Sequence, residues 1–110
     1  MGQKNCPIQR AANVLEGKWT LLILRELLSG TKRFGELRAE ILGVSPKTLT
    51  ERLRILEDQG MLSRTVYPEI PPRVEYRLTE LGEKVRPIIE AMSVWGTNLP
   101  LNSEIEKFSA

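Results

Sequence analysis

Residues 43–60 read GVSPKTLTERLRILEDQG, and this stretch decides the fold. It carries the start and stop signals of one short helix. Ser45 is a favoured N-cap residue, and Pro46 suits the first helical position because its missing N–H would be unpaired there in any case. Gly60 is a typical residue to end a helix. These signals predict a helix that begins at Pro46 and ends just before Gly60.

The predicted helix has two different faces. Its leucines recur at i, i+4 and i+7, which places Leu49, Leu53 and Leu56 in one core-facing stripe. The opposite face and its flanks carry charged and hydroxyl side chains, namely Lys47, Thr48, Thr50, Glu51 and Arg54. A helix packed on one side, with such side chains near its N-terminal end, suits the DNA major groove. The simpler alternative is an ordinary amphipathic surface helix, and the neighbouring sequence decides between the two.

A second short helix is predicted directly upstream. Phe34, Leu37 and Ile41 form another apolar stripe, and the turn LGV joins this segment to the helix at Pro46. Two helices joined by a tight turn that contains glycine form the helix-turn-helix pattern. Residues 18–30 are apolar almost all round and predict the buried helix of the domain, too short for a membrane span. A first helix is expected near residues 7–15.

Downstream of Gly60 the apolar pattern changes to the alternation of strands. LSRTVY (62–67) and RVEYRL (73–78) predict two strands, and in the second strand Val74, Tyr76 and Leu78 share one face. Between them, PEIPP (68–72) holds three prolines that predict a stiff loop. A helix-turn-helix followed by a hairpin predicts a winged helix. The expected fold class is therefore mainly α with a small β-hairpin, α+β.

The same segments resemble the HxlR-type transcriptional regulators of bacteria and archaea. The most specific pieces are Cys6–Pro7, GKWTLLILREL (17–27), RFGEL (33–37), SPKTLTERLRILE (45–57) and VYPEIPPRVEYRLTELG (66–82). The resemblance covers Cys6 to about Trp95 and fades in the tail. It implies a homodimeric, DNA-binding repressor or activator with a winged helix-turn-helix.

Nine residues are predicted to contact double-stranded DNA: Lys32, Arg33, Ser45, Lys47, Thr48, Thr50, Glu51, Arg54 and Arg73. Lys47 is a candidate for a guanine edge or a phosphate, and Thr48 and Thr50 for a thymine methyl or a phosphate. Glu51 is a candidate to accept from a cytosine amino group, or to orient Arg54, which in turn reaches a base or the backbone. For each single residue, the alternative is solvated surface.

The basic residues outside this helix have their own predicted roles. Lys32 and Arg33 precede the first helix of the motif and are candidates to clamp a phosphate. Arg73 follows the stiff loop, and a narrow minor groove attracts arginine through its negative potential. The alternative for Arg73 is an ion pair with Glu69 or Glu75.

A dimerisation helix is expected at the end of the domain. Thr79 is a good N-cap for a helix to about Trp95, with a kink where Pro87 removes a backbone hydrogen bond. This helix carries a broad apolar stripe, made of Val85, Ile88, Ile89, Met92 and Trp95. A second copy of the chain is expected to cover the stripe across a two-fold axis, and the alternative is that it folds back onto its own domain.

The domain organisation follows from these elements. Residues 1–96 form the winged domain with its N-terminal and C-terminal dimerisation helices, and residues 97–110 form a tail of unknown role. The SEIEKF segment of this tail suits a short helix.

Cys6 is the single cysteine and lies at the start of the first predicted helix. The partial positive charge there, with Lys4 and Arg10 nearby, favours the thiolate and makes Cys6 a candidate redox or electrophile sensor. The resemblance implies the same role, since some family members sense oxidants through a cysteine at this place. The alternative is a small residue that packs the first helix.

Composition excludes several functions. The chain has no histidine and one cysteine, so it holds no Ser-His-Asp or Cys-His site and no histidine or paired-cysteine zinc site, and we expect no enzyme, metal or cofactor. Its net charge of +2 is a weak basic bias, so specific binding would need base contacts and shape fit.

We expect a cytoplasmic location and no membrane partner, since no secretory signal precedes the first helix. Competing functions are a winged-helix protein-interaction module and a ligand-responsive multidrug-type regulator, and no residue pattern identifies a small-molecule effector.

Overall fold

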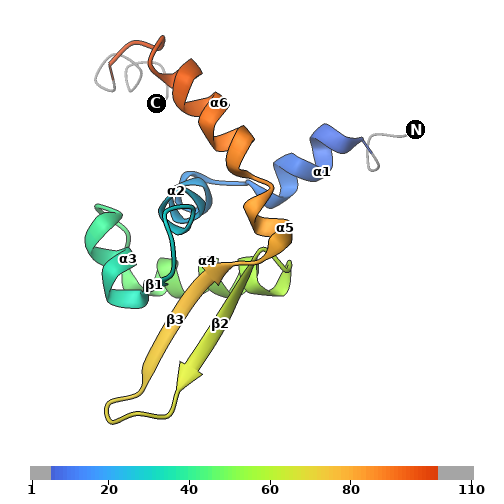
Figure 1. Cartoon of the computed structure of the whole chain (residues 1–110). Coiled ribbons are helices and arrows are strands. Elements are labelled where there is room, and N and C mark those ends of the chain that lie inside the picture. Colours follow the sequence, from blue (N-terminus) through green and yellow to red (C-terminus); the bar gives the residue numbers. More distant parts are fainter. Residues whose placement is uncertain (1–5, 102–110) are drawn as a thin grey trace.

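The computed structural model describes residues 6–101, which form a winged helix with two projecting helices (Figure 1). The elements follow the chain in the order α1 (Pro7–Val14), α2 (Lys18–Leu27), β1 (Lys32–Arg33), α3 (Phe34–Glu40), α4 (Pro46–Asp58), β2 (Leu62–Tyr67), β3 (Arg73–Leu78), α5 (Glu80–Glu83) and α6 (Arg86–Gly96). The predicted fold class, α+β with a winged helix-turn-helix, is confirmed.

Helix α4 forms as its sequence predicts. The Ser45 hydroxyl accepts a hydrogen bond from the Thr48 N–H at 3.1 Å, which caps the N-terminus. At the other end Gly60 takes a φ of +78°, in the left-handed region that favours glycine, and the Met61 N–H bonds back to the Leu56 carbonyl. The leucine stripe of α4 is buried in the core.

The core is built around α2. Its residues Ile23, Leu24 and Leu27 are fully buried and belong to the same apolar cluster as Leu37 of α3 and the leucines of α4. The expectation of a helix that is buried all round is only partly met, because Leu21 and Leu22 are half-buried. These two leucines line a shallow hollow together with Ile89 and Met92 of α6.

The sheet has three antiparallel strands in the order β1-β3-β2. Strands β2 and β3 form the predicted hairpin, with Arg64 opposite Tyr76 and Tyr67 opposite Arg73. The sequence did not indicate β1, which places Lys32 opposite Tyr76. A strand of two residues is too short to show an alternating pattern in the sequence. It is recognised only from its pairing with β3 in the structure.

The predicted helix from Thr79 to Trp95 is broken rather than kinked. Thr79 caps α5, which ends at Glu83, and α6 begins at Arg86 with a proline in its first turn. Pro87 explains the break, because its ring would clash with the carbonyl of residue 83, four positions earlier. Helix α6 therefore leaves the body in its own direction (Figure 1).

Val85 lies at this break and corrects one dimerisation prediction. Its side chain is only 4 % exposed and belongs to the core of its own chain. The Val85 side chain is therefore not available for contact with a second copy of the chain. Among residues 6–101, no helix is long and apolar enough to cross a membrane.

Candidate DNA-binding surface

The N-terminal end of α4 is exposed and held in place by its own cap. The Ser45 hydroxyl also donates a hydrogen bond to Thr48 Oγ1 at 3.0 Å. Both hydroxyls are therefore engaged within the helix, which confirms the capping role of Ser45. That Ser45 and Thr48 contact DNA stays a prediction.

The outward stripe of α4 carries Lys47, Glu51 and Arg54, with Thr50 on the flank towards the hairpin, and all four side chains are exposed. Within residues 6–101 none of the three charged groups forms an ion pair, so no salt bridge joins Glu51 to Arg54. The stripe thus presents one carboxylate, two cations and a hydroxyl that are free to meet a ligand. This arrangement suits base edges and phosphates.

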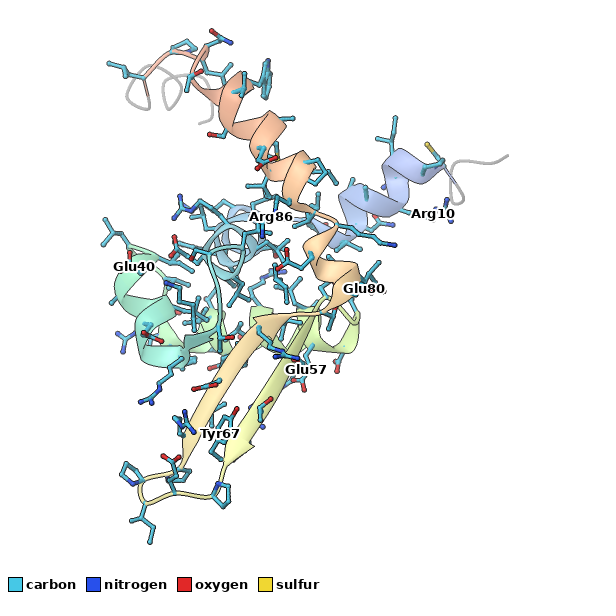
Figure 2. All side chains as sticks on the ribbon, viewed as in Figure 1. Arg10, Glu40, Glu57, Tyr67, Glu80 and Arg86 are labelled. Carbon is cyan, nitrogen blue, oxygen red and sulfur yellow. The ribbon has the colours of Figure 1, made fainter. Side chains whose placement is uncertain are left out.

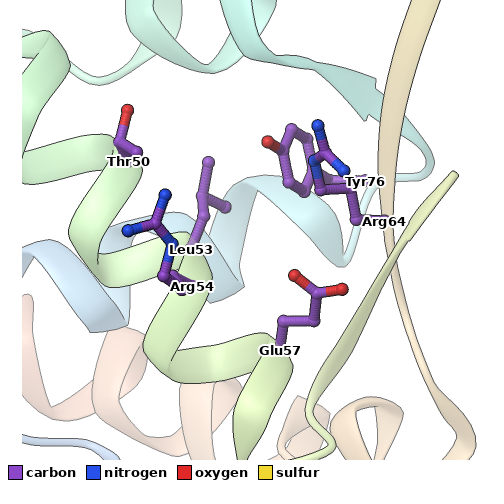
Figure 3. A pocket seen from close by; sticks show the side chains of 6 residues that line it. All are labelled: Thr50, Leu53, Arg54, Glu57, Arg64 and Tyr76. Carbon is purple, nitrogen blue, oxygen red and sulfur yellow. The ribbon is translucent and has the colours of Figure 1, made fainter. Parts of the chain in front are cut away.

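A hollow of about 310 Å³ lies between the exposed flank of α4 and the hairpin (Figure 3). Thr50, Arg54 and Glu57 line it from the helix, and Arg64 and Tyr76 line it from the strands. The sequence alone did not indicate Arg64 as a DNA-facing residue. The alternation of β2 identifies it only once the register is known, because a residue opposite Tyr76 lies on the same face of the hairpin.

Arg73 is held inside the wing. Its guanidinium pairs with Glu69 at 3.0 Å and with Glu75 at 2.9 Å, and it stacks 3.9 Å from the centre of the Tyr67 ring. Tyr67 lies towards the far end of the hairpin (Figure 2). The Arg73 side chain is 28 % exposed, and its buried Nε has no partner in the described part of the chain. Of the two predicted roles, the ion pair is present, with both glutamates as partners. That Arg73 enters a minor groove stays a prediction.

The loop at the end of the hairpin presents an apolar tip. Ile70 is fully exposed, and Pro68, Pro71 and Pro72 beside it are exposed as well. Because Arg73 is neutralised by two carboxylates, the wing offers no unpaired cation beyond Tyr67.

Lys32 and Arg33 lie in β1, between α2 and α3. The Glu36 carboxylate accepts a hydrogen bond from the Arg33 N–H at 2.7 Å and so closes the first turn of α3. The Arg33 side chain is exposed and lines a hollow with the wing loop, whereas Lys32 is half-buried. Their contact with phosphate stays a prediction.

A second surface lies on the side of the body opposite the wing, where α1 and α6 project (Figure 1). Neither helix has a buried residue. Ile89 packs partly against the core, while Ile88, Met92 and Trp95 are exposed, Trp95 by 65 %. Exposed Ile8 and Val94 enlarge the apolar area beyond the predicted set.

Cys6 is half-buried at the N-cap position of α1 and lines a shallow hollow with Ile8, Gln9 and Ala12. Lys4 and the SEIEKF segment lie outside the described residues. Among the described residues no group of three or more acidic or cysteine side chains is arranged to hold a metal ion.

The HxlR-like helix-turn-helix family model matches residues 14–103. The chain is 50% identical over 93 residues to the uncharacterized HTH-type transcriptional regulator sll1512 of Synechocystis sp., covering 84% of this chain and 69% of that protein. A MarR-family regulator from Porphyromonas gingivalis W83 has a similar structure, with a TM-score of 0.86 and 43% identity over 90% of this chain and 98% of that one. The oxidized form of the redox regulator HypR gives a TM-score of 0.81 with 38% identity, covering 86% and 98%. The chain belongs to the HxlR-like helix-turn-helix family of transcriptional regulators.

Proposed function

We propose that this chain binds a specific DNA sequence as a homodimer and represses transcription from the promoter that it covers. The observation that carries the proposal is the outward stripe of α4, where Lys47, Glu51 and Arg54 are exposed and unpaired beside a capped N-terminus. A winged helix that served only a protein partner would be expected to have lost the basic and hydroxyl side chains of this helix. The proposed site of action is the cytoplasm, where the chromosome of a bacterium or archaeon lies.

The homodimer is supported by the apolar surface on α1 and α6. A monomer would leave Ile88, Met92 and Trp95 in water, together with Ile8. A second copy related by a two-fold axis would cover them and leave both α4 helices on the side away from the contact. Two such helices would read a palindromic operator, with half-sites one helical turn or a multiple of it apart.

The test begins with an operator selected from a pool of random duplexes. Fluorescence anisotropy then compares this operator with a scrambled duplex at one salt concentration. We expect a preference of about a thousandfold or more. Lys47→Ala should lower this preference, whereas Arg77→Ala, which removes one positive charge from an exposed position on β3, should leave it unchanged. Equal affinity of the wild type for both duplexes would contradict the proposal, and transcription in vitro from an operator-bearing promoter tests repression.

We also propose that oxidation of Cys6 regulates DNA binding. The proposal is supported by the partial exposure of Cys6 beside the projecting α1 and by the similarity to HypR, a redox regulator with structures in oxidized and reduced forms. Two Cys6 thiols, one from each copy, would form one disulfide and release two protons and two electrons to the oxidant.

Diamide is a suitable oxidant for this test, because its N=N bond takes up the two electrons and two protons. We expect diamide to produce a covalent dimer on a non-reducing gel and to change operator affinity. Dithiothreitol should reverse both effects, and Cys6→Ser should abolish both. A Cys6→Ser protein whose affinity still responds to diamide would refute the proposal.

A second candidate for the signal is a small apolar molecule. A hollow of about 240 Å³ lies among α1, α5 and α6, lined mainly by apolar side chains such as Val14, Leu15, Met61 and Leu81. This hollow adjoins the proposed dimer surface, so a ligand there would affect the distance between the two α4 helices. Screening small aromatic compounds by thermal shift, followed by operator titration with each hit, tests this candidate.

A further inference from the structure

The hollow between α4 and the hairpin has the composition of an anion site. Arg54 and Arg64 line it from two different elements, and Thr50 and Tyr76 each add a hydroxyl. Leu53 lies on the α4 side between Thr50 and Glu57 (Figure 3). Phosphate groups are recognised by guanidinium groups together with hydroxyl donors.

The backbone places these side chains on two facing walls of the hollow, one formed by α4 and the other by the hairpin. Thr50 and Arg54 are four residues apart, so they lie one above the other on the flank of α4 that turns towards the hairpin. Arg64 pairs in register with Tyr76, whose side chain is buried in the core, so both point to the α4 side of the sheet. Both arginines are therefore carried by regular elements, Arg54 by α4 and Arg64 by β2.

The charged side chains that line the hollow form no ion pairs with the described residues. Arg25, Arg73 and Arg86 all form ion pairs in the structure, whereas Arg54 and Arg64 form none with a described residue. Glu57 also lines the hollow, and it makes no ion pair with either arginine. Two guanidinium groups and one carboxylate leave a net charge of about +1 there, which favours an anion.

We infer that this hollow binds a phosphate of the DNA backbone, with Arg64 as its principal ligand and Arg54 and the Thr50 hydroxyl beside it. The inference rests on the proposed DNA-binding function and adds Arg64 to the residues that contact DNA. Thr50 and Arg54 belong to both the hollow and the exposed side of α4, so DNA in contact with the helix passes the mouth of the hollow. The negative charge of the Glu57 carboxylate repels the phosphate, which weakens the contact and keeps it reversible.

The test uses the full chain and the operator selected above. Arg64→Ala should weaken binding to the operator and to scrambled DNA by the same factor, roughly tenfold, since a phosphate contact carries no sequence information. The slope of log K against log salt is negative, and its magnitude should decrease by about one for each Arg64 that no longer contacts DNA. The control is Arg77→Ala, which removes the same charge from the opposite face of the hairpin and should change neither quantity. Glu57→Gln should act in the reverse direction and strengthen binding to both duplexes.

Operators with single neutral methylphosphonates locate the contact. One position should weaken the wild type and have no effect on Arg64→Ala. Unchanged affinity and salt slope in Arg64→Ala, with a wild type that still prefers its operator, would overturn the inference and leave the proposed function standing. A wild type that binds neither duplex would instead refute the proposed function. Saturable binding of inorganic phosphate that Arg64→Ala loses without any change in DNA affinity would also overturn the inference, because the site would then serve a free anion.

Discussion

Gly82 of α5 lies directly against the backbone carbonyl of Met61, at the turn that follows helix α4. A Cβ at position 82 would overlap the Met61 carbonyl oxygen and lie 3.2 Å from Leu78 Cδ2. Thr79 completes the junction: its hydroxyl donates to the Gly60 carbonyl and accepts from the Gly82 N–H. The end of α4 and the start of the segment leading to α6 are therefore joined backbone to backbone.

This junction predicts that Gly82→Ala destabilises the protein by about 3 kcal/mol or more, because a backbone carbonyl cannot rotate away from the added methyl group. Urea denaturation measures the change. Gly35→Ala is the matched control, since it lies in a helix with open space around its Cα and should be neutral or slightly stabilising. Equal stability of the two variants would show that the junction does not need glycine.

The cap of α4 predicts that Ser45→Ala lowers the free energy of unfolding by about 1 kcal/mol, because the Thr48 N–H loses its acceptor. Ser45→Asn should restore most of this stability. Both variants should keep the sequence preference of the wild type if Ser45 acts through the helix alone. A Ser45→Ala protein that is fully stable but no longer prefers its operator would show instead that the hydroxyl reads DNA.

The wing predicts different outcomes for two substitutions of Arg73. Arg73→Ala removes two ion pairs and a stacking contact with Tyr67 and should cost about 1–2 kcal/mol of stability. Arg73→Lys should recover little, because an ammonium group cannot pair with both glutamates while stacking on the ring. A double-mutant cycle with Glu75→Gln measures the pairing, and a coupling of zero would contradict the observed geometry.

The projecting helices predict that Trp95→Glu converts a dimer to a monomer, since a carboxylate would be buried in an apolar contact. Sedimentation velocity measures the change. Ile70→Glu is the control: it introduces the same charge at a fully exposed apolar position on the wing tip and should leave the dimer intact. The prediction fails if the Trp95→Glu protein sediments as the wild type does.

Much of the fold could be predicted because its signals are local. The cap at Ser45, the leucine stripe of α4 and the alternation in β3 each lie within one short segment, and all three are present in the structure. The predicted DNA-facing stripe of α4 is likewise exposed, since helical periodicity that buries Leu49 and Leu53 must turn Glu51 and Arg54 outward.

The remaining features depend on contacts between distant segments. Strand β1 exists because β3 passes beside residues 32 and 33, and Arg64 joins the α4 surface only through the register of the hairpin. The proline at 87 is visible in the sequence, but the contacts of Arg86 at the break are not: its guanidinium donates a hydrogen bond to the Leu28 carbonyl and pairs with Glu83.

By itself the sequence determined the family, the winged helix and the exposed side of α4, because periodicity, caps and prolines act over a few residues. Only the tertiary structure decided that Val85 belongs to the core of its own chain, that Arg73 is held within the wing and that Arg64 faces α4. A side chain's partners depend on which segments meet in space, and no spacing along one segment contains that information.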